Sequence, residues 1–134
     1  MIQQRFTFKS TEKLKSSKLI GQIFSRGKSF SHFPFRAIYI YPEKNKSHLQ
    51  TAFSVSSKNF KKAVDRNRIK RVMREASRLQ KNSLQKKLEQ NQNYLAVFII
   101  YTGSGLPPYE HVFDKMGGLL RRLEKILLSK DDEK

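Results

Sequence analysis

The sequence is first informative through what it lacks. Its 134 residues include no cysteine, no tryptophan and only three histidines. Without cysteine there is no disulfide, thiolate nucleophile or cysteine-based zinc site, and this composition fits a reducing compartment. The longest apolar run, Tyr94–Tyr101, is too short to span a bilayer, and the opening MIQQRFTFKS lacks the apolar core of a signal peptide. We therefore expect a cytoplasmic protein that does not contact a membrane.

Acidic residues are scarce as well. Eleven Asp and Glu oppose 28 Lys and Arg, which gives a formal net charge of +17. Between Lys58 and Lys81 ten basic residues are opposed by Asp65 and Glu75, so this segment alone carries +8. Ten Phe and five Tyr argue against a disordered basic tail. A small folded domain with this charge is expected to bind a polyanion, above all a nucleic acid.

The hydrophobic pattern predicts six elements in the order α-β-β-α-β-α. The predicted helices are Thr11–Arg26, Asp65–Leu79 and Val112–Leu128. Thr11 is the expected N-cap of the first helix, and the second continues after a break through Leu84 and Leu88. The predicted strands are Phe33–Tyr41, Leu49–Ser57 and Tyr94–Tyr101. The first two strands are expected to be antiparallel because their connection is short, and the third to be central because both its faces are apolar.

This order predicts an α/β (α+β) two-layer sandwich with a mixed sheet. We expect a single nucleic-acid-binding domain over residues 1–134, because the chain is long enough to bury one core and carries a large positive charge. Its ordered part should cover about 10–128, followed by a frayed tail at 129–134, where acidic residues gather.

The second predicted helix has two opposite faces. Apolar residues repeat at helical spacing on one side and cations occupy the other. Arg outnumbers Lys along Arg66–Arg78, and its planar guanidinium binds phosphate bidentately. Most charge runs are simply solvated, but a typical solvated face mixes signs at i, i+4, whereas this face stacks like charges. Nucleic-acid binding is therefore the favoured interpretation.

No group of side chains predicts catalysis by the chain itself. His32, His48 and His111 are scattered, without metal-binding spacing. Glu110 and Asp114 could hold a divalent ion, but a favourable charge effect at a helix N-terminus explains them better. The alternatives to consider are an RNA-binding module of another kind, such as a ribosomal protein, and a stand-alone nuclease, which the absence of an acidic or histidine cluster disfavours.

The segment Phe53–Leu79, FSVSSKNFKKAVDRNRIKRVMREASRL, resembles the signature of the bacterial ribonuclease P protein subunit. Its most specific part is the run from Ala63 to Ala76, which contains Arg66-Asn67-Arg68. Two further stretches resemble the family's first helix and following strand, KLKSSKLIGQIFSRGKSF and PFRAIYIY, so that the resemblance covers roughly residues 10–128.

The resemblance implies both a fold and a function. The fold would be an α/β sandwich with a left-handed β-α-β crossover, against the general right-handed rule. The protein would bind the catalytic RNA of ribonuclease P and the single-stranded 5′ leader of precursor tRNA, and would assist endonucleolytic removal of the leader. The RNA subunit would carry the catalytic centre and use Mg²⁺. No catalytic residue, metal site or protein partner is then expected for this chain.

The resemblance also implies site residues. Phe24 matches an aromatic of the family's leader cleft, which lies between the first helix and the sheet. A second helix aromatic is replaced by Ile20, and the strand aromatic falls at Ile38, with Tyr39 beside it. The residues expected to contact RNA are Lys58, Lys62, Arg66, Asn67, Arg68, Lys70, Arg71, Arg74 and Arg78.

The turn that enters the basic helix departs from the family pattern. The glycine that often precedes Ala63-Val64 is absent, and Asn59–Lys62 is one residue longer. We therefore expect this turn to have its own local structure.

Overall fold

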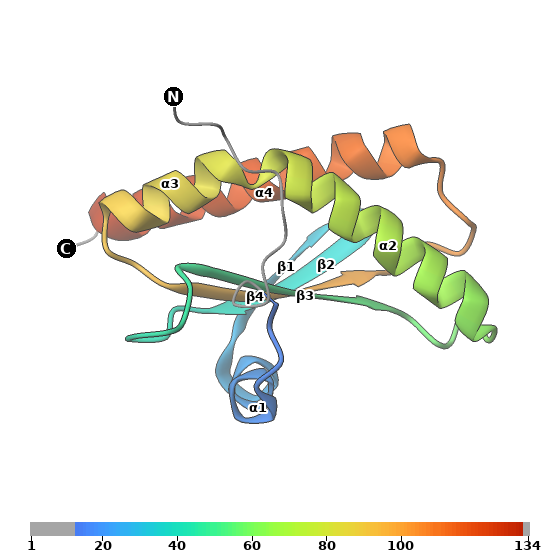
Figure 1. The fold of residues 1–134 in the computed structure, drawn as a ribbon, viewed down its shortest axis with the longest axis horizontal. Coiled ribbons are helices and arrows are strands. Elements are labelled where there is room, and N and C mark those ends of the chain that lie inside the picture. Colours follow the sequence, from blue (N-terminus) through green and yellow to red (C-terminus); the bar gives the residue numbers. More distant parts are fainter. Residues whose placement is uncertain (1–12, 133–134) are drawn as a thin grey trace.

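The computed structural model describes residues 13–132, which form a four-stranded sheet with helices on both faces (Figure 1). The predicted α-β-β-α-β-α order is retained, with one strand and one helix added to it. The elements are α1 (Ser17–Arg26), β1 (Lys28–His32), β2 (Phe35–Ile40), β3 (Leu49–Val55), α2 (Ala63–Gln80), α3 (Asn82–Gln90), β4 (Leu95–Tyr101) and α4 (Tyr109–Asp132).

The sheet is mixed, as predicted, and its strand order is β1-β2-β4-β3. Strand β4 is central, which agrees with its continuous apolar sequence, and it pairs antiparallel with β2 and parallel with β3. Strands β2 and β3 run in opposite directions, as predicted, but β4 lies between them. From β3 the chain returns over the sheet through α2 and α3 and enters β4 behind β3, so the crossover is left-handed (Figure 1).

Two cores of unequal size lie on the two faces of the sheet. Helices α2, α3 and α4 cover one face, and α1 lies on the other (Figure 1). The larger core joins β2 and β4 to α2 and α4 through side chains such as Phe35, Ile99, Met73, Met116 and Leu123. The smaller core consists of Leu14, Ile23, Ile40 and Ala96. Most of the buried apolar surface therefore belongs to the three-helix face.

The N-terminal part of the first predicted helix is wrong. Thr11 lies outside the described residues, and α1 begins at Ser17, where Ser16 Oγ accepts a hydrogen bond from Leu19 N at 3.2 Å. Before it the chain is extended, since Leu14 N donates to Thr51 O at 3.1 Å. Leu14 is buried in the smaller core although it lies in this extended segment. Its apolar side chain fits the helical spacing of the residues that follow, so the sequence pattern extended the predicted helix too far toward the N-terminus.

Strand β1 was missed by the sequence analysis. Three of its five residues are exposed, and Phe30 is its one large apolar residue, so the sequence offers a single apolar position instead of a repeating pattern. It pairs antiparallel with β2 across the Phe33-Pro34 turn. The predicted strand Phe33–Tyr41 therefore begins two residues too early.

The helices of the three-helix face agree more closely with prediction. Helix α2 extends the predicted Asp65–Leu79 by two residues at its start and one at its end, and Lys81 separates it from α3, which buries Leu84 and Leu88. Helix α4 is longer than predicted and continues to Asp132, into the segment 129–134 that the sequence assigns to a tail. Long apolar periodicity thus located these helices, but not their ends.

Candidate nucleic-acid interface

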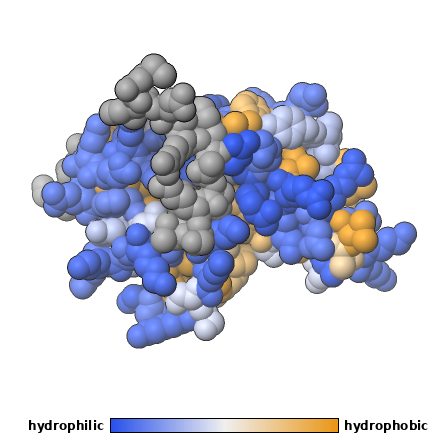
Figure 2. Space-filling view, in the orientation of Figure 1, coloured by the Kyte–Doolittle hydropathy of each residue, from blue (hydrophilic) through white to orange (hydrophobic). Residues whose placement is uncertain are grey.

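Helix α2 separates a buried stripe from a cationic face, as its sequence predicts. Its buried residues include Ile69 and Met73, which belong to the larger core. The view over α2 in Figure 2 is largely hydrophilic, with small apolar patches. We define the basic face of α2 as the polar and cationic residues that point away from this core: Asn67, Arg68, Arg71 and Arg74, which are exposed, and Lys70, which is half-buried.

Arg66 holds the turn that enters α2. Its Nη1 donates to the carbonyl oxygens of Phe60 at 2.7 Å and Lys61 at 2.9 Å. Asn59 Nδ2 in the same turn donates to Gly103 O at 3.2 Å, which links the turn to the end of β4. These bonds fix the conformation of the glycine-free turn. Arg66 therefore uses part of its guanidinium to position the start of α2.

Arg78 is also committed within the chain. It forms an ion pair with Glu75, and its Nε lies 3.2 Å from Glu75 Oε2. The hydrogen bond from Arg78 holds the pKa of Glu75 below its usual value, and the same bond raises the pKa of Arg78. Of the predicted RNA contacts, Arg66 and Arg78 are thus partly used by the fold, whereas Lys58 and Lys62 are exposed near the start of α2.

The basic face of α2 continues around the β3 edge of the sheet. A hollow of about 220 Å³ brings Arg74 together with Lys13 and Lys15 from the segment before α1. Its floor includes Thr51, Ala52 and Phe53 of β3. Because Ala52 packs on the α1 side of the sheet and Phe53 on the opposite side, this hollow connects the two sides.

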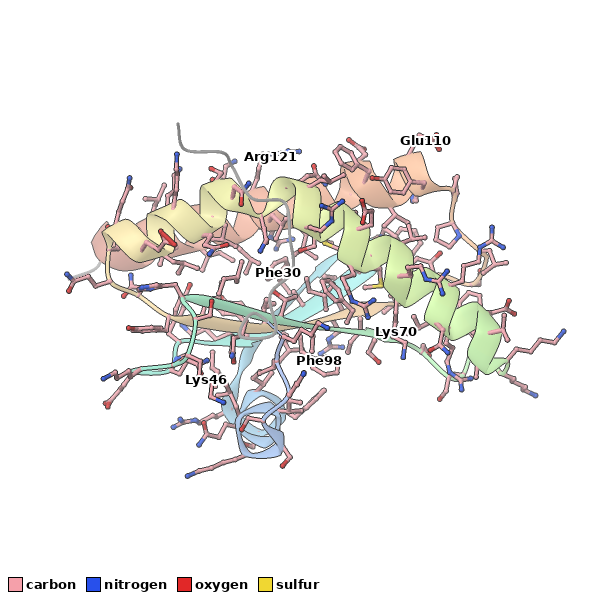
Figure 3. The ribbon with its side chains drawn as sticks, viewed as in Figure 1. Phe30, Lys46, Lys70, Phe98, Glu110 and Arg121 are labelled. Carbon is pink, nitrogen blue, oxygen red and sulfur yellow. The ribbon has the colours of Figure 1, made fainter. Side chains whose placement is uncertain are left out.

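On the α1 side, Phe24 meets a second phenylalanine ring, Phe98, that the sequence analysis did not assign to the site. The ring centroids of Phe24 and Phe98 lie 5.0 Å apart in an edge-to-face arrangement, and Phe24 is 54% exposed. Phe98 projects from β4 toward α1 (Figure 3). Ile20 and Ile38 pack against the same small core. We call Ile20, Phe24, Ile38 and Phe98 the aromatic surface.

The structure separates Tyr39 from this surface. Its neighbour Ile38 packs on the α1 side, whereas Tyr39 is 6% exposed and belongs to the larger core, because successive strand residues point to opposite faces. Its ring lies edge-to-face with Phe30 at 6.1 Å, and burial raises the pKa of its hydroxyl. The ring of Tyr39 therefore lies on the sheet face opposite Phe24, and Phe98, which pairs with Ile38 across the strands, supplies the second aromatic ring on the α1 side.

The sequence alone could not have assigned Phe98 to the site, because this requires the pairing register between β2 and β4. The segment Tyr94–Tyr101 is apolar on both faces, so no alternation distinguishes its α1 side. Once Ile38 is opposite Phe98, the α1 side of the strands becomes defined.

Helix α1 is short and leaves part of the sheet's α1 side without a helix over it, in the part of the chain that the structure describes (Figure 1). The strand register places Arg36, Ile100 and Ser54 side by side one step beyond the row of Ile38, Phe98 and Ala52. Arg36 is exposed, and Ile100 and Ser54 are half-buried. We call this row of Arg36, Ile100 and Ser54 the open floor: it is a part of the sheet surface that lies beside the aromatic surface and includes the cation of Arg36.

Within residues 13–132 no three His, Asp or Glu side chains gather in a way that could hold a metal ion. Glu110, in the first turn of α4, is exposed on the three-helix side (Figure 3). None of the described helices is long and apolar enough to cross a membrane.

A basic helix face joined to an open, aromatic-lined sheet face defines a class, the small α+β proteins that bind RNA. A family model described as Ribonuclease P matches residues 8–124. The chain is 33% identical over 119 residues to the ribonuclease P protein component of Porphyromonas gingivalis (strain ATCC 33277), covering 88% of this chain and 87% of that protein. It is 31% identical over 123 residues to the component from Chlorobium phaeobacteroides, covering 84% of each.

The solved RNase P protein of Staphylococcus aureus has the same fold, with a TM-score of 0.63 and 19% identity over 84% of this chain and 94% of that chain. The chain therefore belongs to the ribonuclease P protein family. It acts in 5′ processing of tRNA as the protein component of this endoribonuclease, together with the RNA subunit, and it binds precursor tRNA.

Proposed function

We propose that the two surfaces have different RNA partners within the holoenzyme. The basic face of α2, with Lys58 and Lys62 at its start, contacts the catalytic RNA. The aromatic surface and the open floor beside it hold the single-stranded 5′ leader. The observation that carries this proposal is the pairing of the exposed Phe24 ring with Phe98 on a sheet face where, among the described residues, α1 is the one covering helix.

The α2 assignment rests on charge and geometry. Cations on one face of a helix bind the phosphate backbone without reading sequence, and binding releases counterions. Arg68, Arg71 and Arg74 are free of carboxylate partners among the described side chains, so their guanidinium groups are available to phosphates. Arg66 and Arg78 would contribute less, because each is already bonded within the chain.

The leader assignment rests on the shape of the α1 side. Single-stranded RNA is held by aromatic side chains on which bases stack, together with cations that follow the backbone. The Phe24 ring offers an exposed stacking face, and Phe98 fixes its orientation. Cations lie around the aromatic surface. They belong to Arg36 on the open floor and to Lys13 and Lys15, which lie beyond Ala52.

In this arrangement the protein contributes charge and position, and the RNA subunit contributes the chemistry with Mg²⁺. Bringing two polyanions together costs electrostatic repulsion, which the +17 charge of the chain offsets. Less Mg²⁺ is then needed to hold the RNAs together. Because ribonuclease P processes tRNA and the chain lacks cysteine, we also place the protein in the cytoplasm.

Reconstitution with a ribonuclease P RNA tests the proposal. The protein alone should leave precursor tRNA intact, and adding it to the RNA should increase cleavage most strongly at low Mg²⁺. Cleavage by the protein free of RNA, with a mock purification as control, would show that the chain has a catalytic centre of its own.

A further inference from the structure

A second hollow lies beside α1, on the flank that faces away from Phe98. It is a groove of about 850 Å³ between α1 and the end of β2 with the loop that follows it. In Figure 3, Lys46 of this loop lies to the left of α1, whereas Phe98 lies above α1 and to its right. We call it the α1 groove. Its charged side chains belong to Lys18, Arg26, Lys28, Glu43 and Lys44, and the rest of its lining is Gln22, Tyr39, Ile40, Tyr41 and Pro42.

The cations of the α1 groove converge from three parts of the chain. Lys18 and Arg26 lie on α1, Lys28 begins β1, and Lys44 lies in the loop after β2; all four are exposed. Among the described side chains no carboxylate forms an ion pair with any of them, although Glu43 lines the same groove. Like charges held this close repel one another, and a bound polyanion would relieve that repulsion.

The solvent-facing side of α1, between the flank that carries Phe24 and the flank that lines the α1 groove, has only small side chains; we call it the outer ridge of α1. At 100° per residue, Phe24 projects on one flank and Gln22 and Arg26 on the other. Ser17, Gly21 and Ser25 occupy the ridge and are exposed, and no atom lies within 4 Å of the position where a Cβ on Gly21 would be. A nucleic-acid strand can therefore cross α1 here without meeting a bulky side chain.

We infer that the α1 groove binds the phosphates of the distal part of the 5′ leader, upstream of the nucleotides that stack on Phe24. The inference rests on the proposed leader surface. A single strand needs a stacking platform and a cationic track, and these lie on the two flanks of one helix. Phe24 and Arg26 are two residues apart, a rise of about 3 Å along α1, so the strand passes from one flank to the other within one turn.

The test uses the reconstituted holoenzyme and two precursor tRNAs. One carries the shortest leader whose binding depends on Phe24, and the other extends that leader by about eight nucleotides. Lys18→Ala combined with Arg26→Ala should weaken binding of the long-leader precursor about fivefold and lower its salt dependence by about one unit, with no change for the short leader. Lys86→Ala combined with Lys125→Ala removes the same charge from exposed positions on α3 and α4 and should change neither.

A second variant tests the crossing itself. Gly21→Glu places bulk and negative charge on the ridge and should also weaken binding of the long leader about fivefold or more, whereas Gly21→Ala should not. Equal losses for both leaders, or weaker assembly with the catalytic RNA, would assign the groove to another RNA segment and overturn the inference. No loss in either variant would mean a solvated groove and would overturn it too. A failure of the proposed function would be distinguished by a different result. In that case the Phe24→Ala variant would keep its full preference for leader-bearing precursor at every leader length.

Discussion

The two faces of the sheet differ in how much of their surface the protein buries for itself. Among the described residues, twenty-one buried side chains form one core on the three-helix face, where α2 and α4 cover the strands. On the α1 face the same residues provide a buried core of four members, and Phe24 remains 54% exposed. The sheet therefore gains its stability from one side and leaves the other side available for a ligand.

The difference shows why one short helix can serve two purposes. Helix α1 spans ten residues and is anchored by Ile23, which is fully buried. Leu19 and Ile20 pack against the same small core, and the rest of the helix surface carries the Phe24 ring on one flank and cations on the other. In contrast, each inward residue of α4 is constrained by packing. Mutations should therefore separate stability from RNA binding according to the face they affect.

The largest expected effect comes from the three-helix face. Leu123→Ala removes a fully buried side chain from α4 and should lower the free energy of unfolding by about 3 kcal/mol, because the cavity adds to the lost burial. Urea unfolding of the isolated protein measures this. Phe24→Ala should cost about 1 kcal/mol or less, since its ring is more than half exposed. Equal losses in the two variants would abolish the distinction between the faces.

The next effect concerns the basic face of α2. Lys70→Ala combined with Arg74→Ala should weaken binding to the catalytic RNA about tenfold and reduce the salt slope by about one to two units, because two phosphate contacts are lost. Titrations over a range of salt concentrations measure both quantities. Lys86→Ala with Lys125→Ala is the matched control, and an unchanged slope in the α2 variant would mean that this face is merely solvated.

A smaller effect is expected at Phe98, on the α1 face. Phe98→Leu keeps an apolar side chain of similar size but removes the edge-to-face contact with Phe24, which is worth about 1 kcal/mol. The preference for leader-bearing precursor should fall about threefold to fivefold while the salt slope stays the same. Competition between precursor and mature tRNA measures it. A change in salt slope without a change in preference would speak against a stacking role.

The smallest effect is a pH dependence on the three-helix face. Burial, and then the nearby Arg122, Lys115 and Arg121, hold the pKa of His32 below its ordinary value of 6.5. The unfolded chain then takes up a proton more readily than the folded one, so this contribution to stability is full above pH 6.5 and declines as the pH falls through that value. His32→Gln should flatten the dependence between pH 8 and pH 5 in urea unfolding. An equally steep curve in that variant would place its cause elsewhere.

Much of the fold could be predicted because the spacing of apolar residues in a long amphipathic segment shows which of its faces is buried. The stripe of Ile69 and Met73 located α2, and the apolar run of β4 placed it at the centre of the sheet. Strand β1 was missed because an exposed edge strand leaves little pattern in the sequence. The start of α1 was misplaced because Leu14 is buried from an extended segment.

The site divides in the same way between local pattern and tertiary structure. The basic face of α2 follows from helical spacing alone, so the sequence predicts it well. The ion pair of Arg78 with Glu75 is also local, since the two residues are three apart on one helix, whereas the bonds of Arg66 to the turn carbonyls and the orientation of Tyr39 depend on how neighbouring segments pack. Phe98 became part of the site only through its register with Ile38 across two strands that are far apart in the chain.

The most direct test of the account is the ratio of affinities for leader-bearing precursor tRNA and mature tRNA, measured with holoenzymes assembled to saturation. Phe24→Ala should reduce this ratio strongly, by about tenfold if one stacked base is lost, while assembly with the catalytic RNA is unchanged. Lys70→Ala with Arg74→Ala should weaken assembly and leave the ratio intact. A ratio that survives Phe24→Ala but falls with the α2 variant would contradict the division of the two surfaces.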